Sequence, residues 1–550
     1  MKEKKQSFTR DEIHNFTKPL LEEMVLRLLD QVDSLNGQVS ELTERINVLL
    51  SNQYGRKTEK SDQIDNQMEF CFNETEITII DASEAQLKEP KISEINPNHT
   101  DDEETPAKKA HPKHSISDQL KALPEKEVTY TLSEEQKHCA CGGSYRQIGK
   151  KTVTRLEFHP ATFEVIKQVI YSYKCDSCGK IIRADHPLPL FEGSLATPSL
   201  IAGIITAKFV NALTYYRLED SFAHNNALLT RQTMARWIIR TADVYFSLLY
   251  DRLKQDLLSR SIIHADETTV EITNDGRPAG AKSYMWAYTT EGNERPVVLF
   301  EYQKTRAHAH AKNFLKDYKG WLCCDGYEAY HSLGNGITVC GCWVHAKRHY
   351  ANAVKALKNL PKRSSEMTVS EEAVQRIGDL FHTDKQWKDL PYEEHLRKRD
   401  TELRAKMEDY FNWAESKIGT VPPKTETGKG LAYSRNQKRY LLGCLTNPEV
   451  PLDNSEAERK IRRFVISRKN FVLIDTIAGA EASAIMFSMC ETARANNLKP
   501  YEYFKYLLEE MPKHMKASHR DMSFLEDLLP WSEALPPEIR KSESNNSAAS

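Results

Sequence analysis

The sequence lacks the features that would direct a protein to a membrane or to secretion. It has no run of about 18 apolar residues, the length that a membrane-spanning helix requires. Residues 1–10 are polar and basic, and no apolar stretch follows them, which argues against a signal peptide. We therefore expect a cytoplasmic protein in which the 11 cysteines are reduced thiols or metal ligands rather than disulfides.

The chain also has little net charge, −2 over 550 residues, which by itself indicates nothing about nucleic acid. The charges are segregated, however, and phosphates respond to local patches. Residues 73–104 carry ten acidic side chains against two lysines and show no sustained apolar periodicity. We therefore predict a flexible acidic linker at residues 61–125, which separates folded domains.

A heptad repeat occupies residues 15–52. Branched residues at position a and leucine at position d favour a parallel two-stranded coiled coil, so we predict a homodimer or a higher oligomer. An amphipathic helix that lies on the protein's own core is the alternative. The a positions are Val25, Val32, Val39 and Ile46, and the d positions are Leu28, Leu35, Leu42 and Leu49.

Two pairs of closely spaced cysteines lie within residues 126–190, and a glycine follows each pair. Four thiolates in such pairs fit a tetrahedral, structural Zn²⁺ site, with four free buried thiols as the alternative. One pair has a single-residue spacer, so His138 is a candidate to replace a thiolate there. We predict a small zinc-binding domain with the ligands Cys139, Cys141, Cys175 and Cys178.

Residues 195–260 read as helical almost throughout. Two segments with a break before Thr230 have the outline of a helix-turn-helix, and Thr230 is a plausible N-cap for the second helix. Arg231, Gln232 and Arg236 on that second helix are candidates for DNA contacts. Ordinary helix packing is the alternative, because helix pairs with short turns are common.

A predicted strand at residues 261–270 carries a carboxylate in the middle of an apolar stretch. Side chains in a strand alternate between two faces, so Asp266 shares a face with Ile262 and His264, whereas Glu267 points to the other face. A buried carboxylate is costly unless something pairs with it. The partner of Asp266 is either a metal ion or a basic residue in a structural salt bridge, and the strand alone does not decide between them.

A second carboxylate, Asp325, ends a later short strand. Three strands, a helix and this fourth strand are consistent with a ribonuclease-H-like α/β core, in which Asp266 and Asp325 lie on adjacent strands. Downstream, Cys342 and His345 have metal-ligand spacing, but no second pair is near them, and we predict structural packing there. The predicted elements are strands at 284–290, 296–302 and 320–327 and a helix at 307–318.

A third carboxylate lies on a helix that begins after an Asp/Asn cap at residues 453–454. Glu458 borders the apolar stripe of this helix, whereas Glu456 projects elsewhere, so Glu458 is the better candidate to face a core site. A solvated charged helix is the alternative. The basic residues around Glu458 form a possible seat for DNA phosphates: Arg459, Lys460, Arg462, Arg463, Arg468 and Lys469.

Two strand aspartates and one helix glutamate can together hold two divalent ions close to each other. Mg²⁺, or Mn²⁺ in its place, prefers such oxygen ligands and keeps positions open for phosphate.

At this point the chain resembles transposases of the insertion-sequence 66 family, within the Asp-Asp-Glu superfamily. The motifs that carry the resemblance are Gln-Tyr-Gly-Arg-Lys-Thr-Glu-Lys at 53–60, the cysteine pairs within 139–178, His-Ala-Asp-Glu-Thr at 264–268, Cys-Asp-Gly-Tyr-Glu-Ala-Tyr at 324–330, Cys-Trp-Val-His-Ala-Lys-Arg at 342–348, Asp-Asn-Ser-Glu-Ala-Glu-Arg at 453–459 and Ser-Arg-Lys-Asn-Phe at 467–471.

The resemblance implies a DNA transposase that binds terminal inverted repeats, cleaves a strand at each end and joins the 3′-hydroxyls to target DNA. By the same resemblance, Asp266, Asp325 and Glu458 are the catalytic acids, and companion proteins encoded by the same element are possible partners. Such a protein would associate with the nucleoid when bound. The single-residue spacer between Cys139 and Cys141 departs from the two residues that the family more often has.

The sequence therefore predicts a multi-domain protein. A catalytically inert, zinc-dependent DNA-binding regulator is the rival hypothesis, although the presence of all three acids counts against it, and a coiled-coil scaffold is a third. Beyond the coil, linker, zinc and helical regions above, we assign the catalytic core to 261–365 and 431–495, a helical insertion to 366–430, and a C-terminal helical segment and polar tail to 496–550.

Overall fold

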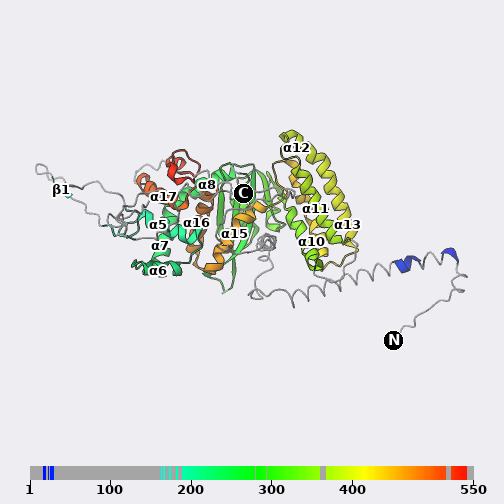
Figure 1. Cartoon of the computed structure of the whole chain (residues 1–550), viewed down its shortest axis with the longest axis horizontal. Coiled ribbons are helices and arrows are strands. Elements are labelled where there is room, and N and C mark those ends of the chain that lie inside the picture. The colour runs from blue at the N-terminus through cyan, green and yellow to red at the C-terminus, as the bar shows by residue number, and fades with distance from the viewer. Residues whose placement is uncertain are drawn as a thin grey trace, which may run out of the picture. The chain divides into compact units, whose positions relative to one another are not determined.

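The computed structural model describes residues 189–515 and 522–541 except 279, 293 and 359–366, together with short stretches at 17–19, 23, 25–29, 163, 165–166, 172–174 and 181–183 (Figure 1). These residues fall into two compact units, which divide at Ile238 and Asn497. None of the described helices combines the length and the apolarity needed to cross a membrane. The four predicted zinc ligands, the acidic linker and most of the predicted coiled coil lie outside the described residues.

A six-stranded sheet forms the centre of the unit that contains residues 239–496. β3, β4 and β5 run antiparallel in succession, β6 pairs in parallel with the other edge of β3, and β7 pairs in parallel with β6. β8 pairs with the far half of β3. The strands are β3 Ile262–Asn274, β4 Lys282–Thr290, β5 Val298–Gln303, β6 Gly320–Cys324, β7 Ile337–Gly341 and β8 Leu473–Thr476.

The predicted adjacency of the two aspartate-bearing strands is confirmed, because β3 and β6 are hydrogen-bonded neighbours and Asp325 directly follows β6. Gly320 makes this close pairing possible at the start of β6. Its φ is +152°, and a Cβ atom there would lie 2.3 Å from the carbonyl oxygen of Ser261. A side chain at this position would therefore push β6 away from β3.

Helices cover both faces of this sheet. The Phe300 ring on β5 contacts Phe464 of α15 and Phe487 of α16, with centroids 6.1 and 6.0 Å apart. On the other face, Tyr288 of β4 stacks on Phe314 of α9 at 3.8 Å. The core is thus a mixed α/β structure, as predicted. These helices are α8 Ser247–Leu258, α9 His308–Phe314, α15 Ser455–Phe471 and α16 Ile477–Ala495, preceded by the π-helical turn η4 Ala242–Phe246.

A helical bundle follows β7, and α10, α11 and α13 run side by side in Figure 1. Its interior is aromatic, and Trp343 contacts both Tyr410 and Phe411. The bundle continues through α14, past residue 430. Its helices are α10 Trp343–Lys358, α11 Val369–Lys385, α12 Tyr392–Lys398, η6 Arg399–Leu403, α13 Arg404–Ile418 and α14 Glu426–Leu441, and the short turns η5 Glu328–Tyr330 and η7 Gly443–Thr446 flank it in the sequence.

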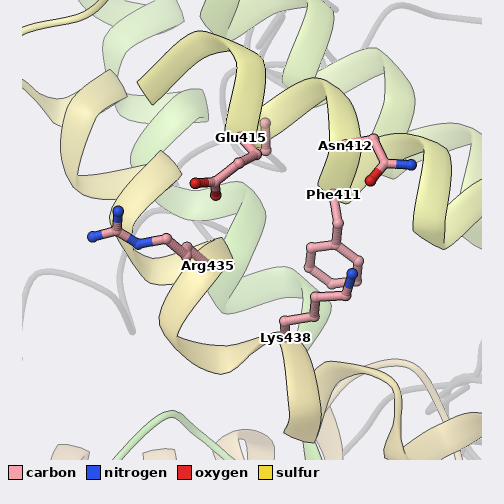
Figure 2. A pocket seen from close by; sticks show the side chains of 6 residues that line it. Phe411, Asn412, Glu415, Arg435 and Lys438 are labelled. Atoms are coloured by element: carbon pink, nitrogen blue, oxygen red, sulfur yellow. The ribbon is translucent and has the colours of Figure 1, made fainter. Parts of the chain in front are cut away.

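Figure 2 shows a small hollow between α13 and α14. The Lys438 ammonium lies 5.0 Å from the Phe411 ring centre and forms a 2.6 Å ion pair with Glu408. The charge of Lys438 at this hollow is therefore matched within the bundle.

The second unit combines residues 83–238 with residues 497–550. α17 packs on α5, and both bury aliphatic and aromatic side chains such as Ile201 and Phe504. The hairpin of β1 and β2 flanks residues 175–180 in the predicted zinc-binding domain. The elements are β1 Ser172–Lys174, β2 Ile181–Arg183, α5 Pro198–Ile205, η3 Thr206–Val210, α6 Tyr215–His224, α7 Arg231–Thr241, α17 Pro500–His514, α18 Phe524–Leu528 and η8 Pro537–Ile539.

At the N-terminus, the described part of the predicted coiled coil is helical at residues 18–19, 23 and 25–29. Val25 and Leu28, the first predicted a and d residues, are 54% and 56% exposed in the single chain. Self-association through this seam stays a prediction.

Candidate active site

Asp266 lies in the middle of β3, paired across the sheet with Ala287. Its neighbour Ala287 is in turn paired with Phe300, so Asp266 shares the face that α15 and α16 cover. The Asp266 Oδ1 atom accepts a hydrogen bond of 2.9 Å from the Glu267 N–H. The aspartate therefore projects between the sheet and the helix that carries Glu458.

Glu267 projects to the opposite face, as strand alternation predicts. Its Oε1 atom accepts a 2.7 Å hydrogen bond from Arg306 Nε, and its Oε2 atom accepts a 2.5 Å hydrogen bond from the Tyr330 hydroxyl. Its side chain is only 1% exposed. Both oxygens of Glu267 thus have protein partners, which matches its exclusion from the predicted metal ligands.

Asp325 sits at the point where β6 ends and the backbone turns. Its Oδ1 atom accepts a 2.9 Å hydrogen bond from the Tyr327 N–H, which fixes the carboxylate at the strand tip. Because β6 is parallel to β3, its carboxyl end opens beside the middle of β3, where Asp266 lies.

Asn454 holds the start of α15 against β3. Its Oδ1 atom lies 2.8 Å from His264 Nδ1, and its Nδ2 donates to the Ala265 carbonyl at 2.8 Å. The predicted Asp/Asn cap is therefore corrected in one respect: Asn454 is the N-cap residue, but its side chain makes no capping bond. Asp453 instead accepts the Ser455 N–H at 2.9 Å.

Glu458, in the first turn of α15, faces the start of α10. Its Oε1 atom lies 3.6 Å from His345 Nε2 and 3.4 Å from an Arg348 guanidinium nitrogen. Across the part of the chain that is described, the group of metal-ligating side chains whose donor atoms all lie within 4.8 Å of one another is Cys342, His345 and Glu458. Asp266 and Asp325 lie outside that group.

The carboxylates nevertheless interact electrostatically. Burial first, and then the charges of Glu267, Asp325 and Glu458, raise the pKa of Asp266 well above its ordinary value. Burial also raises the pKa of Asp325, although the hydrogen bond from the Tyr327 N–H and then the charge of Arg306 lower it. Burial raises the pKa of Glu267 to about 7. Such a concentration of carboxylates is costly unless protons or a cation neutralise it.

The predicted DNA-contacting helix begins where the sequence places it. Thr230 Oγ1 accepts the Thr233 N–H at 3.3 Å, so the predicted N-cap is confirmed. Arg231, Gln232 and Arg236 are exposed, while Met234 is fully buried. α7 therefore has one face in the protein and one polar face in solvent.

The basic residues of α15 differ in their ion pairs and in their exposure to solvent. Arg459 and Lys460 pair with Glu456, and Arg463 pairs with Glu491 at 3.3 Å. Arg459, Arg463 and Lys469 are exposed, and Lys460 and Arg462 are partly covered.

Arg468 differs from the other basic residues of α15. It is 6% exposed, and its Nη1 atom donates to Thr269 Oγ1 at 3.1 Å. Its place on the apolar stripe, three residues after Val465 and four after Phe464, explains this burial. Arg468 holds α15 to β3 instead of facing solvent.

Several residues around the acids were not predicted from the sequence. Asn454 donates a hydrogen bond to β3. Arg306 donates to Glu267, and Arg348 forms an ion pair with Glu458. His264 Nε2 also lies 2.5 Å from Glu291 Oε2. The one local signal was the placement of His264 two residues before Asp266 on the same strand face.

Comparison with protein families matches almost the whole of this arrangement. Residues 193–482, more than half of the chain, match the model described as Transposase IS66 family. Residues 488–531 match the IS66 C-terminal element, residues 136–179 the zinc-finger binding domain of transposase IS66, and residues 41–128 the Transposase C of IS166 homeodomain.

Two curated relatives from Sinorhizobium fredii (strain NBRC 101917 / NGR234) are similar over most of their length. Uncharacterized protein y4qI is 24% identical over 524 residues, which cover 92% of this chain and 91% of the relative. Uncharacterized protein y4jD is 25% identical over 433 residues, which cover 75% of this chain and 80% of the relative.

The matches account for zinc-finger, DNA-binding and insertion-sequence features in one chain, and the predicted resemblance is confirmed. The chain therefore belongs to the IS66 family of transposases.

Proposed function

We propose that this protein cleaves DNA strands at the terminal inverted repeats of an insertion sequence and joins the freed ends to target DNA. The observation that carries the proposal is the placement of Asp266 and Asp325 on neighbouring parallel strands, with Glu458 on the helix that packs over the same face. Acids in this arrangement suit phosphodiester hydrolysis and transesterification assisted by divalent ions.

A ribonuclease-H-like core is part of this proposal. The strands β3, β4 and β5 are antiparallel in succession, β6 then pairs in parallel with β3, and β7 pairs in parallel with β6. This order agrees with the topology expected for that fold. The helical bundle enters between β7 and α15, and so lies in sequence between the second and third acids.

The donor set fits a hard divalent cation. Asp266 and Asp325 supply carboxylate oxygens, and burial, which raises the pKa of both, makes their ionised forms costly without a partner cation. Mg²⁺ or Mn²⁺ favours such oxygen ligands. When bound, the ions would activate a water or 3′-hydroxyl and stabilise the leaving oxygen.

Glu458 would complete this donor set from the first turn of α15. Its contacts with His345 and Arg348 hold it on the α10 side, so it would exchange them for the Asp266 side during catalysis. Asn454 keeps the backbone of α15 in place throughout, because its side chain is bonded to two groups of β3.

The remaining residues would bind DNA. The solvent-facing positions of α15, above all Arg459, Arg463 and Lys469, suit phosphates, and the exposed face of α7 suits a groove. Structural Zn²⁺ held by residues 139–178, self-association through residues 15–52, and accessory proteins of the same element complete the proposal.

The test uses full-length protein, a duplex that carries the element's own ends, and Mg²⁺. Asp266→Asn should lower cleavage about a thousandfold, because a bound ion contributes several kcal/mol to the transition state and each 1.36 kcal/mol is tenfold. Glu271→Gln is the matched control, since Glu271 is an exposed carboxylate on the same strand. Cleavage that survives Asp266→Asn would refute the assignment, and end binding by the wild type without any cleavage would support the inert regulator.

A further inference from the structure

Three side chains of different chemistry meet where two helices begin. Cys342 directly precedes α10, His345 lies in its first turn, and Glu458 lies in the first turn of α15. Their sulfur, nitrogen and oxygen donors are all within 4.8 Å of one another. This meeting is independent of Asp266 and Asp325, which contribute no atom to it.

The local geometry explains the convergence. Residues three apart at the start of a helix lie on the same side of it, so Cys342 and His345 are directed together. The Asn454 N–H donates to Cys342 Sγ at 3.3 Å, which ties the start of α15 to the start of α10. Glu458, one turn further along α15, is thereby brought against His345.

The cluster has the features of a cation site rather than of packed core. His345 Nδ1 is buried and has no hydrogen-bond partner among the described residues. The side chains of His345 and Glu458 are 18% and 20% exposed, so an ion can reach them from solvent, while Cys342 forms the buried wall.

A thiolate, an imidazole and a carboxylate form a donor set that Zn²⁺ takes in tetrahedral sites, with the fourth position open to water. Mg²⁺ discriminates against sulfur and nitrogen ligands. The Arg348 guanidinium, 3.4 Å from Glu458, opposes an incoming cation and would have to move aside.

We propose that Cys342, His345 and Glu458 form a second metal site, selective for Zn²⁺ or another thiophilic divalent ion, which competes with the Asp266 and Asp325 pair for Glu458. The competition rests on the proposed function, whereas the metal site itself does not. Occupancy of this site holds Glu458 on the α10 side and thereby stops strand cleavage.

Metal binding is tested on the full-length protein that has first received one equivalent of Zn²⁺ for its zinc finger, has been dialysed to remove more weakly bound Zn²⁺, and is then titrated with Co²⁺. A further, saturable thiolate-to-cobalt charge-transfer band should form in the wild type and in Asp266→Asn. Cys342→Ser should abolish that band, and His345→Ala should weaken Co²⁺ binding about tenfold or more. Cys490→Ser, which alters a buried free thiol on α16, is the matched control and should keep the band. The absence of the band in the wild type, or its persistence in Cys342→Ser, would overturn the site.

Competition is tested by adding Zn²⁺ to cleavage reactions that contain excess Mg²⁺. Zn²⁺ should inhibit the wild type at concentrations about tenfold or more below those that inhibit Cys342→Ser. Equal inhibition of the two proteins would overturn the competition. A wild type that forms the cobalt band but never cleaves DNA would refute the proposed function and leave the metal site standing.

Discussion

Arg399 connects the helical bundle to the loop that leads into α15, and its replacement should be severely destabilising. Its Nε and Nη2 atoms donate to the two carboxylate oxygens of Asp384 at 2.6 and 2.7 Å. Its Nη1 atom donates to the carbonyl oxygens of Cys444, Asn447 and Val450 at 2.9, 2.8 and 2.8 Å. The residue is only 2% exposed.

Arg399→Met keeps most of the side-chain volume and removes every donor. It leaves the Asp384 carboxylate without its bidentate partner in a largely covered position, together with three carbonyl oxygens that lose their shared donor. Removing one partner of a buried ion pair costs about 3–5 kcal/mol, because the remaining charge is desolvated. Asp384 would keep the longer contact with His395 Nε2, 3.2 Å from its Oδ1 atom. We expect a loss of that size in the free energy of unfolding.

The assay is urea unfolding followed by tryptophan fluorescence. Five of the seven tryptophans lie between residues 239 and 496, so the signal reports mainly on the unit that contains Arg399. Arg404→Met is the matched control, because Arg404 pairs with Asp400 at 2.8 Å with both side chains exposed, at 43% and 61%. The control should cost less than about 0.5 kcal/mol. Equal losses for the two variants would refute the reasoning.

Two further predictions concern the same unit. Asn454→Ala removes two buried hydrogen bonds to β3 and should cost about 2–3 kcal/mol. It should also lower cleavage by displacing Glu458, whereas Asn496→Ala, which also loses two bonds to carbonyls, should lower only stability. A hydrogen bond from His349, above all, lowers the pKa of Glu426 to about 2, so this group contributes stability above pH 4.5 that is lost as the pH falls towards 2. Glu426→Gln should therefore lower the free energy of unfolding by about 1 kcal/mol at pH 7, allowing for solvent screening, and by less at pH 3.5. Urea unfolding at the two pH values measures this, and a loss that is equally large at pH 3.5 would contradict the prediction.

Local patterns determined much of the candidate site. Alternation along β3 separated Asp266 from Glu267, and the apolar stripe of α15 directed Glu458, rather than Glu456, toward the α10 side. The same stripe contains Arg468, which we had grouped with the phosphate-binding residues, and this periodicity explains why it is buried instead. These features depend on residues within one or two turns or on alternate strand positions, and short-range backbone geometry dictates them.

Long-range packing decided the rest. The bond between Asn454 and His264 joins residues that are 190 apart in sequence, and it determines where α15 begins relative to β3. Likewise, spacing alone paired Cys342 with His345, but only the fold brought Glu458 to them. No local pattern encodes such a meeting, because it depends on how the whole bundle and sheet bury their apolar faces together. The sequence by itself determined which faces carry the acids, and the tertiary structure decided which side chains those acids meet.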